Sequence, residues 1–92
     1  MKWSNGIKIY NTETGILKKM VVETEDLGEG FTRYCTRSLY LKKDNGEHFL
    51  HVSHITTDRK DVIFDKQEWI VTVTDEWARM FNKTTPELYP NI

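Results

Sequence analysis

The feature that most constrains the fold is a ten-residue stretch, residues 60–69, in which a short strand is followed by a helix cap. Val62 and Phe64 alternate as residues on one face of a strand do. Asp65 is a favourable N-cap residue, and Glu68 three positions later completes an acidic variant of the capping box. The stretch predicts that the strands come first in the chain and that one amphipathic helix comes last.

The predicted helix covers residues 66–82. Its apolar positions recur with helical spacing and form one stripe, widened by Ile70 and Phe81: Trp69, Val73, Trp77 and Met80. The alternative is a strand over residues 66–73, because residues 70–74 are all β-branched. In that case the helix begins only at Thr74, which is itself a suitable cap. The apolar spacing persists to Phe81 and favours the long helix.

A hairpin is predicted where Asn45-Gly46 separates two strand-like runs, because this dipeptide suits a two-residue type I′ turn. In the register set by that turn, Tyr40 faces His51 and Leu39 faces Val52. The core face then carries Leu39, Leu41, Leu50 and Val52. The opposite face carries Tyr34, Tyr40, Lys42, Phe49 and His51.

Ninety-two residues are enough for one domain with a modest core. We expect an N-terminal extension over 1–15 with a short strand at 7–10, an antiparallel sheet over 16–64, the helix over 66–82, and an irregular tail over 84–92. Within the sheet, a strand at 16–24 is followed by a loop at 25–30. The predicted fold class is α+β, with a curved antiparallel sheet of four to five strands followed by one long C-terminal helix.

Charge and hydropathy exclude several classes of protein. Residues 31–60 carry six basic and three acidic side chains, residues 61–92 carry the reverse, and the net charge is −1. This balance is not the strongly basic footprint of a duplex-DNA binder. The apolar runs are too short to span a bilayer, and Met1 is not followed by a signal segment. We expect a cytoplasmic protein without membrane association.

No motif for catalysis or metal binding is present, so we expect a non-enzymatic protein with no cofactor and no metal. The acids of residues 25–30 do not have the spacing of a calcium loop, and the histidines are the other cluster that invites a metal site. On a strand, however, His51 points away from His48 and His54, which lie about 20 Å apart. Cys35 is a single cysteine and is expected to be structural.

The best chemical lead is the mixture of aromatic and basic residues on the predicted hairpin. Aromatic rings and a histidine can stack on bases, and cations can contact phosphates. The stacking residues are Tyr34, Tyr40, Phe49 and His51. The phosphate contacts are Arg33, Arg37, Lys42 and Lys43. The alternative is that the N-terminal residues, or a second subunit, cover these aromatic rings.

The stretch from residue 60 resembles the strand-to-helix junction of the positive-cofactor-four family of transcriptional coactivators. The matching residues are Lys60, Val62, Phe64, Asp65, Glu68 and Trp69. Asp61 stands where that family usually has glycine, and Thr72 where it tends to have leucine. The resemblance covers residues 16–82. It implies a homodimer whose curved sheets bind single-stranded DNA, with Trp69, Val73 and Trp77 at the dimer interface.

Two functions follow from these observations. The leading hypothesis is binding of single-stranded nucleic acid through the aromatic and basic face. The rival is a small phage-type inhibitor or adaptor, which docks on a larger protein partner through the same residues acting as a hot-spot patch. Salt dependence distinguishes the two, because phosphate contacts weaken steeply as salt rises.

Overall fold

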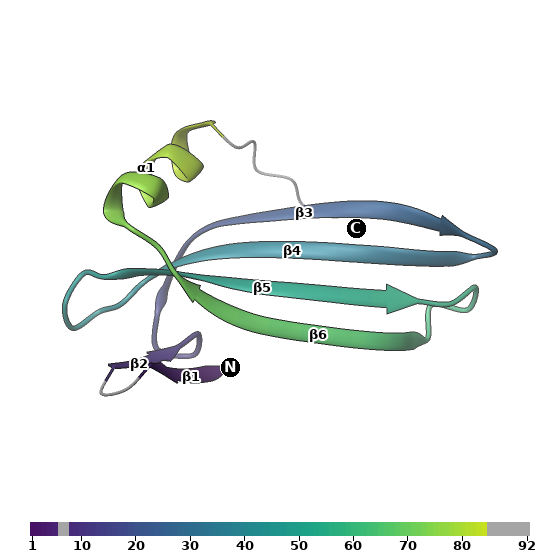
Figure 1. Cartoon of the computed structure of the whole chain (residues 1–92), viewed down its shortest axis with the longest axis horizontal. Helices are drawn as coiled ribbons and strands as arrows, with labels where there is room; N and C mark the ends of the chain where they lie inside the picture. Colours follow the sequence, from purple (N-terminus) through teal and green to yellow (C-terminus); the bar gives the residue numbers. More distant parts are fainter. Residues whose placement is uncertain (6–7, 85–92) are drawn as a thin grey trace.

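The computed structural model describes residues 1–5 and 8–84, and most of them lie in β-strands (Figure 1). The elements in chain order are β1 (Lys2–Asn5), β2 (Lys8–Asn11), β3 (Ile16–Gly28), β4 (Phe31–Leu41), β5 (His48–Thr57), β6 (Ile63–Thr72) and α1 (Asp75–Thr84). β1 and β2 pair as one antiparallel sheet, and β3 to β6 form a second in chain order. The predicted α+β fold with a long C-terminal helix is therefore wrong, since strands dominate and the helix is short.

The long sheet has two unlike ends. α1 and the β1–β2 hairpin both lie at the end that we call proximal, while the four strands continue beyond them to the other, distal end (Figure 1). The distal end is formed by the β3–β4 turn at residues 28–30 and the β5–β6 connection at residues 58–62.

Two small cores lie on opposite faces of the proximal half. On the helix face, α1 covers the sheet with Ala78 and Phe81, and the buried cluster contains Val21, Leu39, Leu50, Val52, Ala78 and Phe81. On the hairpin face, the β1–β2 hairpin covers the sheet, and the buried cluster contains Tyr10, Phe49 and Ile70. Buried Lys19 ties α1 to β3, because its Nζ donates to the carbonyls of Phe81 (3.5 Å) and Asn82 (3.0 Å).

The predicted helix over 66–82 is wrong in its first half. Residues 63–72 form β6, which pairs with β5 at every residue except Phe64, so Asp65 and Glu68 lie within a strand and cap nothing. The alternative start is confirmed: the Thr74 hydroxyl accepts a hydrogen bond from the Trp77 N–H at 3.1 Å, as an N-cap does. β-branched residues and a neighbouring strand that supplied hydrogen bonds outweighed the local capping signal.

The predicted hairpin register is also wrong, by two residues. Leu39 lies opposite Leu50 and Tyr40 opposite Phe49, because the β4–β5 loop is longer than two residues. The loop is closed by the Lys42 N–H donating to the Glu47 carbonyl, and only Gly46 in it has a positive φ, 71°. A shift of two keeps each side chain on its face, so the core face of Leu39, Leu50 and Val52 is confirmed.

Three further expectations are corrected or fall outside the structure. β3 extends to Gly28, so the predicted loop over 25–30 shrinks to a tight turn. The predicted strand at 7–10 corresponds to β2 (Lys8–Asn11), and its first residue lies outside the described residues. The predicted tail lies outside the described residues except for Thr84. No helix in the part of the chain that the structure describes is long and apolar enough to cross a membrane.

Candidate interaction surfaces

The aromatic and basic residues predicted to form one binding face lie on opposite faces of the sheet. Tyr40 packs on the hairpin face, whereas Arg37 lies on the helix face, 5.6 Å from the centre of the Phe81 ring. Arg33 shares the face of Arg37 because residues alternate along β4. Both arginines pair with acids of β3: Arg37 with Glu23 at 2.9 Å and Arg33 with Glu25 at 3.4 Å. The arginines are therefore separated from the tyrosines that they were expected to assist.

The N-terminal hairpin covers the aromatic residues at the centre of the predicted face. The Phe49 side chain is fully buried, with 0% exposure, against Tyr10 and Ile70. The Tyr40 ring stacks on the Phe49 ring, with the ring centres 5.3 Å apart and the planes 9° from parallel. Phe49 has no surface left for a base, and Tyr40 has one ring face occupied. The alternative in which N-terminal residues cover these rings is thus confirmed for Phe49.

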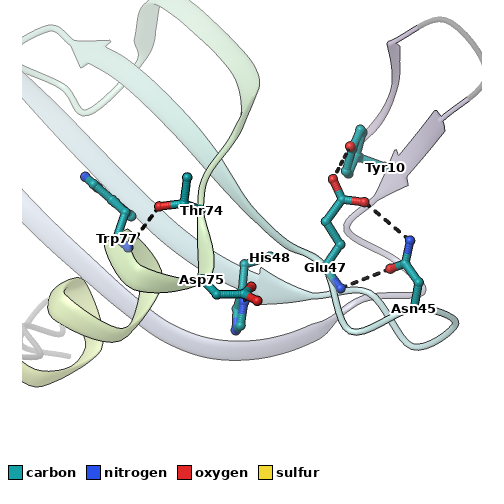
Figure 2. A network of polar contacts seen from close by, with 7 residues as sticks. All are labelled: Tyr10, Asn45, Glu47, His48, Thr74, Asp75 and Trp77. Atoms are coloured by element: carbon teal, nitrogen blue, oxygen red, sulfur yellow. Dashed lines mark hydrogen bonds and ion pairs between the residues drawn. The ribbon is translucent and has the colours of Figure 1, made fainter.

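A polar network at the proximal end holds the hairpin against the β4–β5 loop (Figure 2). The Tyr10 hydroxyl donates to Glu47 Oε1 at 2.6 Å, and the Asn45 side chain donates to Glu47 Oε2 at 3.3 Å. Burial of Tyr10, and then its bond to the Glu47 carboxylate and the charge of that group, raise the pKa of Tyr10 to about 12. The same hydrogen bond holds the pKa of Glu47 below its ordinary value, against the opposing effect of burial.

Two of the predicted phosphate contacts, Lys42 and Lys43, do lie together. With Lys2 of β1 they line a hollow of about 390 Å³, which we call the lysine hollow. The Lys42 Nζ lies 4.8 Å from the centre of the Tyr10 ring. Lys2 was missed by the sequence reasoning, because only the packing of the hairpin brings it next to the β4–β5 loop.

The residues predicted at a dimer interface lie on three different segments. Trp69 is in β6, where its ring and that of His54 meet edge to face with their centres 5.0 Å apart. Val73 follows β6 and packs against the helix-face core. Trp77 is in α1, stacked on Phe81 at 5.2 Å. They do not form the single helical stripe that was expected, although Trp69 and Trp77 are both more than a third exposed.

The three histidines do not share a partner: His48 contacts α1, whereas His51 and His54 contact different residues of β6. His48 Nδ1 lies 3.0 Å from Asp75 at the start of α1 (Figure 2). His51, a predicted stacking residue, lies on the hairpin face with Nε2 buried, 3.6 Å from the Glu68 carboxylate. Within residues 1–5 and 8–84, no three histidine, cysteine or acidic side chains are grouped as metal ligands.

An exposed apolar surface lies at the distal end, where no prediction had placed a site. Leu27, Phe31 and Phe64 line a hollow of about 570 Å³ on the helix face. The Phe31 and Phe64 rings meet edge to face at 5.4 Å, yet Phe64 remains 72% exposed. The neighbouring Val62 and Ile63 are also more than half exposed. We call the three apolar residues that line this hollow the distal patch: Leu27, Phe31 and Phe64.

A β-bulge directs Phe64 into this patch. Thr56 pairs with Asp65 and Thr57 pairs with Ile63, so Phe64 is an extra residue in β6 with no partner of its own in β5. A bulge of this kind turns a side chain away from strict alternation. The Phe64 side chain thereby reaches Phe31 on the helix face. It lies on the same face as the side chain of Asp65, although consecutive residues of a regular strand point to opposite faces.

The loops beside the distal patch are held by polar contacts. The Asp58 carboxylate accepts from the backbone N–H groups of Lys60 (2.9 Å) and Val62 (3.0 Å). The Arg59 Nε donates to the Glu29 carbonyl at 2.9 Å and so joins the two loops. Gly30 has φ +86°, and a Cβ there would lie 2.0 Å from Arg59 Cγ, so the position requires glycine. The two loops beside the distal patch are therefore held in defined conformations by these contacts.

The sequence contained a signal for this surface: Val62-Ile63-Phe64 is an apolar run directly after a polar connection. The residues that carry the family resemblance lie in this connection and in β6, rather than at a strand-to-helix junction. Comparisons with protein families, with curated proteins and with solved structures found no match to this chain.

Proposed function

We propose that this protein is a non-enzymatic binding module that docks on a larger protein through the distal patch, as an inhibitor or adaptor. The observation that carries the proposal is the exposure of Phe64: 72% of a phenylalanine side chain faces solvent at the end of a sheet that neither α1 nor the hairpin covers. A large exposed aromatic residue within an apolar patch is typical of an interaction surface.

The surroundings of the patch support a protein partner. Aromatic anchors surrounded by polar residues are the usual composition of a protein interface. Here Glu29, Arg59 and Lys60 line a second hollow beside Phe31. The overall charge of −1 favours neither strong attraction to nor strong repulsion from a polyanion.

The test compares Phe64→Asp with Leu17→Asp, a matched control at an exposed leucine of β3. Each tagged protein is used to capture partners from cells that contain the natural protein, and each captured partner is then purified and titrated. We expect a partner that binds wild type and Leu17→Asp equally, loses at least tenfold in affinity for Phe64→Asp, and changes little between low and moderate salt. Equal affinity of the partner for all three proteins would refute the assignment to the distal patch.

A second candidate, binding of single-stranded nucleic acid, is favoured by the lysine hollow. Lys2, Lys42 and Lys43 converge there from two elements, and Tyr40 lies in the strand that leads into it. This candidate keeps the ligand implied by the family resemblance but transfers the phosphate contacts from Arg33 and Arg37 to Lys2.

Fluorescence anisotropy with labelled single-stranded oligonucleotides tests the second candidate. If it holds, wild type binds with steep salt dependence, and Lys42→Glu/Lys43→Glu lowers both the affinity and the salt slope. Lys60→Glu, at the distal end, serves as the control and should bind as wild type does. Absence of binding at low salt would leave the protein-binding proposal alone.

A further inference from the structure

β6 is an edge strand whose outer side has no strand beside it among residues 1–5 and 8–84. It is ten residues long, and every residue except Ile70 is exposed. The backbone N–H and C=O groups of such an edge are a template for pairing with another strand.

The two edges of the sheet differ in how well they are protected. β3, the other edge, has a bulge between Leu17 and Lys19 and carries three acids close together at its distal end: Glu23, Glu25 and Asp26. Bulges and clustered charges are the usual protection of an edge strand. β6 has its bulge at Phe64, near its start, and then runs without proline or interruption to Thr72. The edge without a bulge is therefore the one formed by residues 65–72, and its charges, Asp65, Lys66 and Glu68, are of both signs rather than all acidic as on β3.

We propose that β6 pairs antiparallel with β6 of a second copy of this chain, around a two-fold axis at Gln67. In this register Lys66 lies opposite Glu68 of the second copy, and Glu68 lies opposite Lys66. Lys66 and Glu68 lie on the same face of β6, with Nζ and the carboxylate 3.9 Å apart within one chain. Unlike charges directly opposite one another on a sheet stabilise the pairing, so the two-fold axis uses this pair twice.

The same charges oppose the neighbouring registers. Moving the axis by one residue places Lys66 opposite Lys66, or Glu68 opposite Glu68, and moving it to Asp65 places two aspartates together. Like charges directly opposite one another destabilise a sheet. Gln67 is the one uncharged residue among residues 65–68, so of the four registers centred on these residues only the one at Gln67 avoids like charges and pairs unlike ones.

The consequence is one continuous sheet in which the distal end of each copy lies beside the proximal half of the other. β3, the protected edge, then forms both outer borders. The pairing uses the backbone of residues 65–69 and does not depend on the proposed docking of another protein, because Phe64 points to Phe31 on the helix face.

The first test is sedimentation equilibrium of the full chain over a wide concentration range. Wild type is expected to dimerise, Lys66→Glu to weaken the dimer by about tenfold or more, and Lys66→Glu/Glu68→Lys to restore it, because the double variant reverses both charges. Circular dichroism confirms that each variant is folded. A monomer at all concentrations, or a dimer that Lys66→Glu leaves unchanged, would overturn the proposal.

A cross-link tests the position of the axis independently. In a Cys35→Ser background, Gln67→Cys places two thiols opposite each other across the pair, within the Cα separation that a disulfide requires. We expect mild oxidation to convert this variant to a covalent dimer on a non-reducing gel. Lys18→Cys on β3, oxidised in the same way, should stay monomeric. A dimer in solution without the Gln67→Cys cross-link would place the interface elsewhere and contradict the proposal.

Discussion

Phe49 and Phe64 are the same amino acid in adjacent strands of one sheet, yet the first is 0% exposed and the second 72%. The sheet beneath them does not account for the difference. Phe49 lies in the proximal half, where the β1–β2 hairpin covers one face, and Phe64 lies at the distal end, which neither added element reaches. Burial in this protein is therefore decided by what lies on the sheet rather than by the strands themselves.

The two halves consequently differ in what they contribute: the proximal half contributes most of the stability, and the distal end offers exposed surface. Both apolar cores lie in the proximal half, so the free energy of folding is concentrated there. The distal end is held by strand pairing and by loop contacts such as Arg59 to the Glu29 carbonyl. Regions with few buried apolar contacts are generally the less stable and the more available for binding.

The sharpest test of this comparison is a matched pair of truncations. Phe49→Ala should lower the free energy of unfolding by about 3–5 kcal/mol, because it opens a cavity beneath the hairpin. Phe64→Ala should change it by about 0.5 kcal/mol or less, because the side chain is already solvated. Urea denaturation followed by tryptophan fluorescence measures both. Equal losses would mean that the distal end is covered in solution.

Lys19→Met tests whether α1 is tied to the sheet by the charge at its C-terminus. The lysine Nζ donates to two carbonyls at the end of α1, and a methionine keeps the length without the donor. We expect a loss of about 1–3 kcal/mol, from the bonds of a charged donor and from the helix dipole. Hydrogen exchange should quicken in α1 and stay unchanged at the distal turn. Unaltered exchange in α1 would count against this role.

Tyr10→Phe tests the link that holds the hairpin. At neutral pH we expect a loss of about 1 kcal/mol or somewhat more, since Glu47 loses its donor. The raised pKa of Tyr10, about 12, means that its contribution is complete below pH 10 and lost as pH rises from 10 to 12. The lowered pKa of Glu47 means that its contribution is lost as pH falls through the folded value.

The difference in unfolding free energy between wild type and Tyr10→Phe should therefore shrink at both extremes of pH. Denaturation series at several pH values measure this difference. A constant difference across the pH range would show that the hydroxyl contributes through packing alone.

The smallest expected effect is that of the helix cap. Thr74→Ala should cost about 1 kcal/mol, because the Trp77 N–H loses its acceptor, and Thr74→Ser should cost little. The change lies in the proximal half, so exchange at the distal turn should not respond. If Thr74→Ala and Thr74→Ser lowered the free energy of unfolding equally, the loss could not be attributed to the capping hydrogen bond.

Much of the sheet could be predicted from alternation alone. The strands after Ile16 and around the Asn45-Gly46 loop were located, and the core face of Leu39, Leu50 and Val52 was right despite the wrong register. It survived because a shift of two residues preserves the face of every side chain. The loop length itself depends on Glu47, whose carbonyl closes the loop and whose carboxylate is held by Tyr10 from the other sheet.

The helix boundary could not be predicted with the same certainty, because two local signals conflicted. Asp65 and Glu68 match a capping box, while residues 70–74 are β-branched. β5 resolved the conflict by offering a strand partner to every residue of 63–72 except Phe64. The distal patch was missed for a related reason, since Phe64 reaches Phe31 only through a bulge that exists once β5 and β6 pair.

The sequence by itself determined the periodicities: which residues alternate along each strand, which loops need glycine, and where a threonine can begin a helix. These are local properties, set by the backbone and by neighbours within a few residues. Only the tertiary structure decided which apolar residues are buried, because the hairpin and α1 both dock at the proximal end. That choice hides Phe49, exposes Phe64, and brings Lys2 to Lys42 and Lys43, and each of these depends on contacts between segments distant in the chain.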